Sequence, residues 1–262
     1  MRMDFAIIVL VAVVGISIFL YVKTHRCCKG EACGAKVPVY VLVGAPGSGK
    51  GTLAEKLVAD KLFAHVATGN MFRHHIAQQT ELGKRVSELY KAGALIPDEI
   101  VIAMVREALT GAAQEKKPAI LLDGFPRTHA QVDVLAALSK EPEFAHFDFK
   151  VVHINVPSAD MLLDRLTSRV ICSKPECQAT YSLHGMTDQE KTEMICKKCG
   201  GTLTKRSDDE VEAIKKRIET YVKTEAELLK GFDQAKVPVI VLDGTKSIGD
   251  VYNEFAQKSE QK

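Results

Sequence analysis

The run GAPGSGKGT at residues 44–52 has the residue types that a protein needs to hold phosphate groups. Its glycines let successive backbone N–H groups point inward, and Lys50 adds a mobile positive charge. The Thr52 hydroxyl is placed to reach a nucleotide-bound Mg²⁺. Gly51 stands between the lysine and the threonine, which are adjacent in the common consensus. We expect the phosphates of a nucleotide to bind at Gly47, Ser48, Gly49, Lys50, Gly51 and Thr52.

The segments on either side of this loop favour the same interpretation. The apolar run Pro38–Val43 precedes it, and Leu53 and Leu57, one turn apart, begin a helical pattern after it. The N-terminus of that helix would direct the positive end of its dipole at the phosphates. A glycine-rich turn without a ligand is the alternative, but it would not require the lysine or the threonine. The order strand, loop, helix therefore predicts a nucleotide-binding protein.

Five short apolar runs are typical of buried strands, and helical patterns separate them. Strands that are apolar throughout and alternate with helices favour an α/β fold, with a parallel sheet covered on both faces. Ligands of such sheets bind at the carboxyl ends of the strands, where the loop, Asp123 and the turn at 243–246 would converge. The predicted strands are Tyr40–Val43, His65–Ala67, Ala119–Asp123, Lys150–Val156 and Pro238–Leu242.

Two segments do not fit simple crossover helices, and we interpret both as insertions on the ligand side of the sheet. Thr68–Ile96 has a local helical pattern with its own polar face. Ser168–Asp209 has little periodicity and contains four cysteines.

The four cysteines are spaced as two metal-binding turns, Cys172/Cys177 and Cys196/Cys199. Paired thiolates suit a tetrahedral structural Zn²⁺, which would stabilise a segment without a core of its own. The first pair is wider than the usual two-residue spacing, so unmetallated or redox-active cysteines remain the alternative. Similar zinc ribbons occur in nucleic-acid binders. With 35 basic and 33 acidic residues among 262, however, the composition disfavours nucleic acid as a partner.

The N-terminus carries a different signal. Phe5–Val22 is an uncharged run of 18 residues, which as a helix would rise about 27 Å and cross a bilayer. A cleaved signal peptide is the alternative, although its apolar region is normally shorter and a cleavage site normally follows. The basic residues that follow the run predict a single-pass membrane protein with its large domain in the cytosol. Cys27 and Cys28 are either palmitoylation sites or ordinary linker cysteines.

The longer motifs resemble those of the adenylate kinase family. The resemblance rests on the loop at 44–52, the segment ATGNMFR at 67–73, the run DGFPRT at 123–128 with Gln131 beyond it, and the turn DGTK at 243–246. It runs in unbroken order from about Pro38 to Phe255, and the cysteine-bearing insert is similar to the long, zinc-carrying lid of that family. The apolar N-terminus is not part of the family pattern.

The resemblance implies a P-loop fold in which MgATP and AMP react reversibly to give two ADP. Arginines would neutralise the moving phosphoryl group, and Asp123 would organise Mg²⁺ through water. It implies catalytic roles for Lys50, Asp123, Arg127, Arg169, Arg206 and Arg217. It adds Arg165 and Lys246 to the ATP-binding residues, and it places AMP against Thr68, Arg73, Ile96, Gly124, Arg127, Gln131, Arg206 and Arg217.

The sequence departs from the family pattern at three positions. Val170 stands where a second arginine usually follows Arg169, Asn70 replaces the customary aspartate, and Ala94 stands where a lysine is common. The last two changes could alter the affinity for AMP in either direction. The rival functions are a membrane-tethered nucleotide sensor without turnover and a kinase for another nucleoside monophosphate.

The expected organisation is therefore a kinase domain at 37–258 with an AMP-binding insert at 67–96 and a lid at 168–209. We expect the kinase domain to be a monomer whose two inserts close over the substrates and exclude water. The remaining segments are a flank at 1–4, the membrane helix at 5–22, a linker at 23–36 and a tail at 259–262.

Overall fold

The computed structural model describes residues 36–60 and 62–260. Its central sheet has five parallel strands in the spatial order β2-β3-β1-β4-β8. The predicted parallel sheet is confirmed, and every predicted strand overlaps an observed one. The strands are β1 (Val37–Val43), β2 (Phe63–Ala67), β3 (Ala119–Asp123), β4 (Phe147–Asn155) and β8 (Val239–Asp243).

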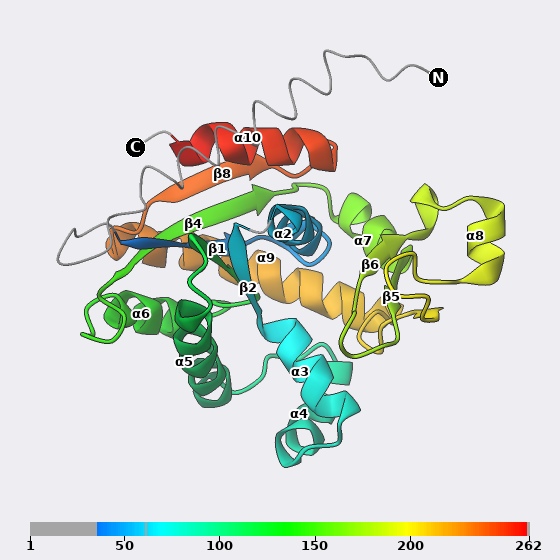
Figure 1. Cartoon of the computed structure of the whole chain (residues 1–262), viewed down its shortest axis with the longest axis horizontal. Helices are drawn as coiled ribbons and strands as arrows, with labels where there is room; N and C mark the ends of the chain where they lie inside the picture. Colours follow the sequence, from blue (N-terminus) through cyan, green and yellow to red (C-terminus); the bar gives the residue numbers. More distant parts are fainter. Residues whose placement is uncertain (1–35, 61, 261–262) are drawn as a thin grey trace.

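Helices cover both faces of this sheet (Figure 1). On one face, α2 (Lys50–Ala59) and α10 (Ile248–Glu260) bury Leu57 and Phe255 against Tyr40 of β1. The other face is covered by α5 (Asp98–Gln114), α6 (His129–Leu138) and α9 (Val211–Gln234). Each fully buried Leu or Phe side chain contributes about 2 kcal/mol to stability, so the two cores hold the sheet rigidly.

The strand register places the expected site residues at one edge of the sheet. Asp123 pairs with Leu42 of β1 and with Ala67 of β2, directly before the phosphate loop and α3 (Thr68–Ala77). The parallel strands therefore end together where the phosphate loop, Asp123 and the AMP-binding insert begin.

The first insert is a pair of helices, α3 and α4 (Glu81–Lys91). The Thr80 hydroxyl caps α4 by accepting a hydrogen bond from the backbone N–H of Gly83 at 3.0 Å. The helices approach so closely at Gly83 that an added Cβ would lie 2.1 Å from the carbonyl oxygen of His75. This contact requires glycine, and it fixes the angle at which α3 projects over the sheet edge.

The second insert, which we call the lid (168–209), follows α7 (Ala159–Thr167) and contains a small antiparallel sheet that the sequence did not predict. Its strands are too short to give an alternating pattern, and the cysteine cluster supplies part of its core. The strand order is β6-β5-β7, with β5 (Arg169–Cys172), β6 (Thr180–Ser182), β7 (Leu203–Thr204), the 3₁₀ turn η1 (Leu183–Gly185) and the helix α8 (Asp188–Glu193).

The predicted membrane helix at residues 5–22 lies outside the described residues. Within the described ranges 36–60 and 62–260, no helix combines the length and the apolar character needed to cross a membrane. The 24-residue α9, for example, buries Ile214, Ile218 and Phe232, while Lys215 and Lys216 lie on its exposed side.

Candidate active site

The phosphate loop curls between β1 and α2 as its glycines predict. Gly44, Gly47 and Gly49 all have positive φ angles, of 153°, 84° and 101°. A Cβ on Gly44 would lie 2.6 Å from the carbonyl oxygen of Ile154, so no other residue fits there. The loop backbone is therefore shaped by glycine before any ligand binds.

Lys50 opens α2 and folds back across this loop. Its ammonium donates to the carbonyl oxygens of Gly44 and Ala45 at 2.8 and 2.9 Å. Burial lowers its pKa to about 8, the charge of Asp123 opposes that shift, and Arg127, Arg217 and Arg169 add to it. These four side chains lie close enough to act on Lys50 because the end of β3, the lid and α9 meet beside the phosphate loop.

The run 123–128 crosses the site beside the phosphate loop. The buried Thr68 hydroxyl donates to the carbonyl oxygen of Asp123 at 3.3 Å. Gly124 has a φ of 85°, and a Cβ there would lie 2.4 Å from the Thr68 oxygen. Arg127 Nε donates back to the Gly124 carbonyl at 2.9 Å, which holds the guanidinium over the site. Desolvation and then the charge of Arg217 lower the pKa of Arg127.

Gln131 is buried behind Arg127, and much of its hydrogen-bonding capacity is used within the protein. Its carboxamide oxygen accepts the backbone N–H of Arg127 at 2.7 Å, and its amide nitrogen donates to Asp98 at 2.6 Å. Asp98 also accepts the hydroxyl of Thr128 at 3.0 Å. One amide hydrogen of Gln131 remains for a ligand. Asp98 was not predicted, because a carboxylate in the first turn of a helix usually only stabilises that helix.

Two adjacent aspartates fix the arginines that close the site from the lid and α9. Asp209 accepts Arg169 through both carboxylate oxygens, at 2.8 and 2.5 Å, and Arg217 at 3.2 Å. Asp208 accepts Arg217 at 2.8 Å. Burial would raise the pKa of Asp208, but the surrounding arginines, Arg217 first, lower it overall. Through these contacts the two aspartates tie the base of the lid to α9.

Arg206 stands apart from these pairs. Its Nε is buried without a hydrogen-bond partner among the described residues, and Nη2 reaches the Thr180 hydroxyl only at 3.5 Å. Burial and the charges of Arg73 and Arg169 lower its pKa to about 9. A guanidinium whose buried Nε has no partner among the described residues is suited to an anionic ligand.

Arg165 and Arg73 reach the site from opposite sides. Arg165 of α7 lies 3.5 Å from the carbonyl oxygen of Gly47, above the phosphate loop. Arg73 of α3 donates from Nη1 to the Tyr90 hydroxyl at 2.7 Å and from Nη2 to the Asn70 carboxamide. Tyr90 was not predicted, and no sequence signal separates it from the packing residues of α4.

The two remaining predicted contacts, at Ile96 and Lys246, are ones that backbone atoms would make to the nucleotides. Ile96 is buried in the core just before α5. The Lys246 ammonium pairs with Glu254 of α10 at 3.1 Å, so its side chain is already engaged.

The four lid cysteines come together as a possible metal site. All four sulfur atoms lie within 4.8 Å of one another, with Cys172 and Cys199 Sγ 3.4 Å apart and Cys177 and Cys196 Sγ 3.7 Å apart. Four thiolates bound to one zinc at about 2.3 Å would be separated by similar distances. Burial raises the pKa of Cys172 to about 12. Burial would also raise the pKa of Cys196, but hydrogen bonds, the first with Tyr181, lower it to about 6.

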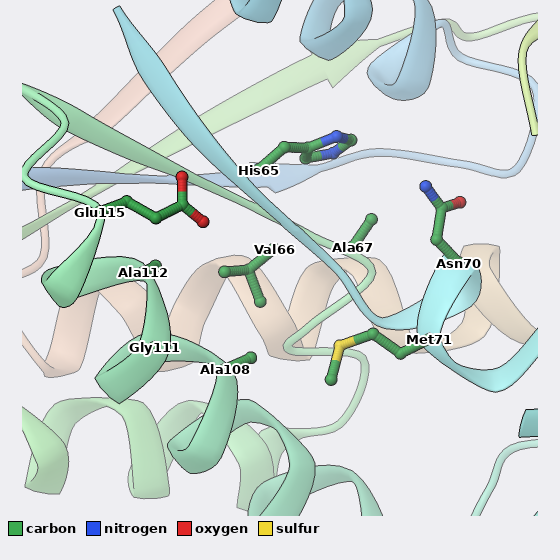
Figure 2. Close-up of a pocket in the computed structure, with 9 residues that line it drawn as sticks. All are labelled: His65, Val66, Ala67, Asn70, Met71, Ala108, Gly111, Ala112 and Glu115. Atoms are coloured by element: carbon green, nitrogen blue, oxygen red, sulfur yellow. The ribbon is translucent and has the colours of Figure 1, made fainter. Parts of the chain in front are cut away.

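A separate cavity of about 300 Å³ opens at the outer edge of the sheet, between β2 and α5. Figure 2 shows His65 and Val66 on opposite faces of β2, with the small residues Ala108, Gly111 and Ala112 on the facing side of α5. His65 Nε2 is buried without a hydrogen-bond partner among the described residues. None of the predicted site residues lines this cavity, but Asn70, which accepts a hydrogen bond from Arg73, does.

A half-buried lysine, a carboxylate and several fixed guanidinium groups thus converge on a glycine-rich phosphate loop. Such a site can hold two phosphate-bearing groups end to end and neutralise the charge that spreads over a phosphoryl group in transfer. Fold and site together define a P-loop phosphotransferase.

Comparison with known proteins gives the particular family. The family model described as adenylate kinase matches residues 42–237. An adenylate kinase of Bacillus pumilus is 41% identical over 215 residues, which cover 82% of this chain and 94% of that protein. One from Carboxydothermus hydrogenoformans is 41% identical, covering 81% of this chain and 94% of its own, and one from Bacillus cytotoxicus is 43% identical, covering 74% and 86%. The chain belongs to the adenylate kinase family and is a nucleoside monophosphate kinase.

These findings correct the predicted localisation. The relatives that match this chain over most of their length are bacterial adenylate kinases. The prediction of a single-pass membrane protein with a cytosolic kinase domain is therefore wrong on these findings. It relied on the hydropathy of a segment that lies outside both the family match and the described residues.

Proposed function

We propose that this site transfers the γ-phosphoryl group of ATP in line to the phosphate of AMP, reversibly, giving two ADP. The AMP phosphate oxygen is already anionic, so the site needs no strong general base. Its task is to align donor and acceptor and to neutralise charge. We also propose the predicted boundaries, a kinase domain at 37–258 with inserts at 67–96 and 168–209.

ATP binds along the phosphate loop in this proposal. The backbone of residues 47–52 and Lys50 hold its phosphates, with Arg165 above the loop and the backbone of Lys246 beside the base. Thr52, in the first turn of α2, and Asp123, at the end of β3, are oxygen donors that fit a hydrated Mg²⁺. When bound with ATP, Mg²⁺ neutralises the β- and γ-phosphate oxygens.

AMP binds on the side of the first insert. Arg73 and Arg127 hold its phosphate, while Thr68, Gln131, Gly124 and Ile96 surround the rest of the nucleotide. Arg169, Arg206 and Arg217 neutralise the phosphoryl group from the lid and α9 as it moves. Closure of both inserts keeps water from accepting the phosphoryl group.

One observation carries this proposal: Lys50 donates to the carbonyl oxygens of Gly44 and Ala45 in the phosphate loop, and the charges of Asp123, Arg127, Arg169 and Arg217 all act on it there. A coupled assay for ADP with AMP, GMP, UMP and CMP as acceptors tests it. We expect kcat/KM for AMP to exceed that for each other acceptor by at least about tenfold, because the site's polar groups are placed for one base. A preference for another acceptor would contradict the assignment of the AMP side.

We further propose that the cysteine cluster binds one structural Zn²⁺, because the sulfur separations fit a tetrahedral thiolate site. Metal analysis of purified protein is expected to find about one zinc per chain in wild type and none in Cys199→Ser. The lid of Cys199→Ser should also lose its ordered structure, because the small sheet formed by β5, β6 and β7 has a small core. The phosphate loop lies outside the lid and should be unaffected. Zinc-free wild-type protein with an equally stable lid would refute the site.

A further inference from the structure

The lid and the AMP-binding insert touch each other directly at Gln178, a residue that lies between Cys177 and β6. Its side-chain oxygen accepts a hydrogen bond from Arg73 Nε at 2.7 Å, and its amide nitrogen reaches the carbonyl oxygen of Asn70 at 3.4 Å. Arg73 and Asn70 both belong to α3. This contact joins two segments that are more than a hundred residues apart in the sequence.

The position of Gln178 is fixed from within the lid. Its backbone N–H donates to the carbonyl oxygen of Lys174 at 3.1 Å, and its amide nitrogen donates to Pro175 at 2.9 Å. Its φ of 46° lies in the left-handed region, which a glutamine adopts only when its surroundings impose it. The wide Cys172/Cys177 turn holds Gln178 in this conformation, so its contact with Arg73 depends on the position of the lid over α3.

Gln178 completes a set of three acceptors around Arg73. The other two are Asn70 and Tyr90, and all three are neutral groups that orient the guanidinium without cancelling its charge. A guanidinium has five N–H donors. In the described part of the chain each nitrogen of Arg73 has one acceptor, which leaves one hydrogen on Nη1 and one on Nη2. Two parallel donors are the arrangement that binds a phosphate group bidentately.

We infer that Gln178 is a positioning residue that links closure of the lid over ATP to the orientation of Arg73 for the AMP phosphate. This inference rests on the proposed role of Arg73. In the closed form Gln178 holds Nε, so both terminal nitrogens face the ligand. When the lid opens, that hydrogen bond is lost and Arg73 keeps only its partners on the first insert.

The test compares AMP affinity with and without a non-hydrolysable ATP analogue, by calorimetry. In Gln178→Met, which keeps the side-chain length but removes both hydrogen-bonding atoms, we expect AMP to bind about fivefold more weakly when the analogue is present. Without the analogue the change should be less than about twofold, because the open lid makes no contact with Arg73. KM for ATP should stay within about twofold of wild type.

Two further variants keep the result interpretable. Gln178→Gly suits the left-handed backbone and should fold even if the methionine variant does not, with the same selective loss. Gln189→Met is the matched control, because Gln189 is exposed on α8 of the same lid and, among the described residues, its side chain bonds only Glu193. It should bind AMP as wild type does.

Unchanged AMP affinity in the presence of the analogue, or an equal loss with and without it, would overturn the inference. Arg73→Ala separates this failure from failure of the proposed function. If Arg73→Ala loses AMP binding while the Gln178 variants do not, only the link through the lid is wrong. If Arg73→Ala also binds AMP normally, the proposed AMP site is wrong.

Discussion

Lys50→Met is expected to lower kcat by about a hundredfold to a thousandfold, the usual loss when a charge aimed at the transferring group is removed. The ammonium of Lys50 donates to the carbonyl oxygens of Gly44 and Ala45 in the phosphate loop, and methionine fills similar space without a charge. Bound phosphates have the negative charge that loop carbonyls lack, so they should draw the ammonium toward the transferring group. Steady-state kinetics with ATP and AMP measure the effect.

The matched control for this change is Lys215→Met. Lys215 is an exposed lysine of α9 that pairs with Glu212, one turn away, and such pairs contribute little. Its kcat should remain within about twofold of wild type. If Lys50→Met retained the kcat of this control, the phosphate loop would not be the place where transfer occurs.

Asp209→Ala should reduce both stability and catalysis. The Asp209 side chain is only 1% exposed and accepts hydrogen bonds from Arg169 and Arg217. Its loss leaves two cations whose side chains are each only 15% exposed without this partner, which typically costs about 3 kcal/mol in the free energy of unfolding. Because both arginines then lose their fixed direction, kcat/KM should fall by about a hundredfold or more. Denaturant unfolding and steady-state kinetics measure the two effects.

Asp188→Ala provides the comparison for Asp209→Ala. Asp188 lies on α8 of the same lid with a fully exposed side chain and a weak pair to Lys191. It should leave stability and kcat/KM near the wild-type values. An Asp209→Ala protein as stable and as active as this control would show that the aspartates do not hold the arginines in place.

The core fold could be predicted from the sequence because its strands are apolar over their whole length and its helices have one apolar face. Tyr40–Val43 and Ala119–Asp123 were both found as strands. The small sheet of the lid could not be predicted, because β7 has only two residues and cysteine sulfur atoms form part of the core of that sheet. Short strands that depend on a cysteine cluster leave no periodic pattern to read.

The chemical groups of the site could be predicted, but two of the residues that hold them, Asp98 and Gln178, could not. Lys50, Asp123 and Arg127 belong to contiguous motifs whose types suffice to suggest phosphate chemistry. Asp98 and Gln178 act through side-chain contacts between distant segments, Asp98 with Gln131 and Gln178 with Arg73. Such contacts depend on how elements meet in space, and a single sequence does not record them.

The most direct test of the convergent arginine site is the single-turnover rate of phosphoryl transfer in Arg127→Lys, followed by rapid quench with labelled ATP and saturating AMP. Lysine keeps the charge but loses the planar pair of donors. We predict a rate at least about tenfold below wild type. The control Arg106→Lys, which alters a surface pair with Glu141, should leave the rate unchanged. An Arg127→Lys rate equal to that of this control would contradict the account.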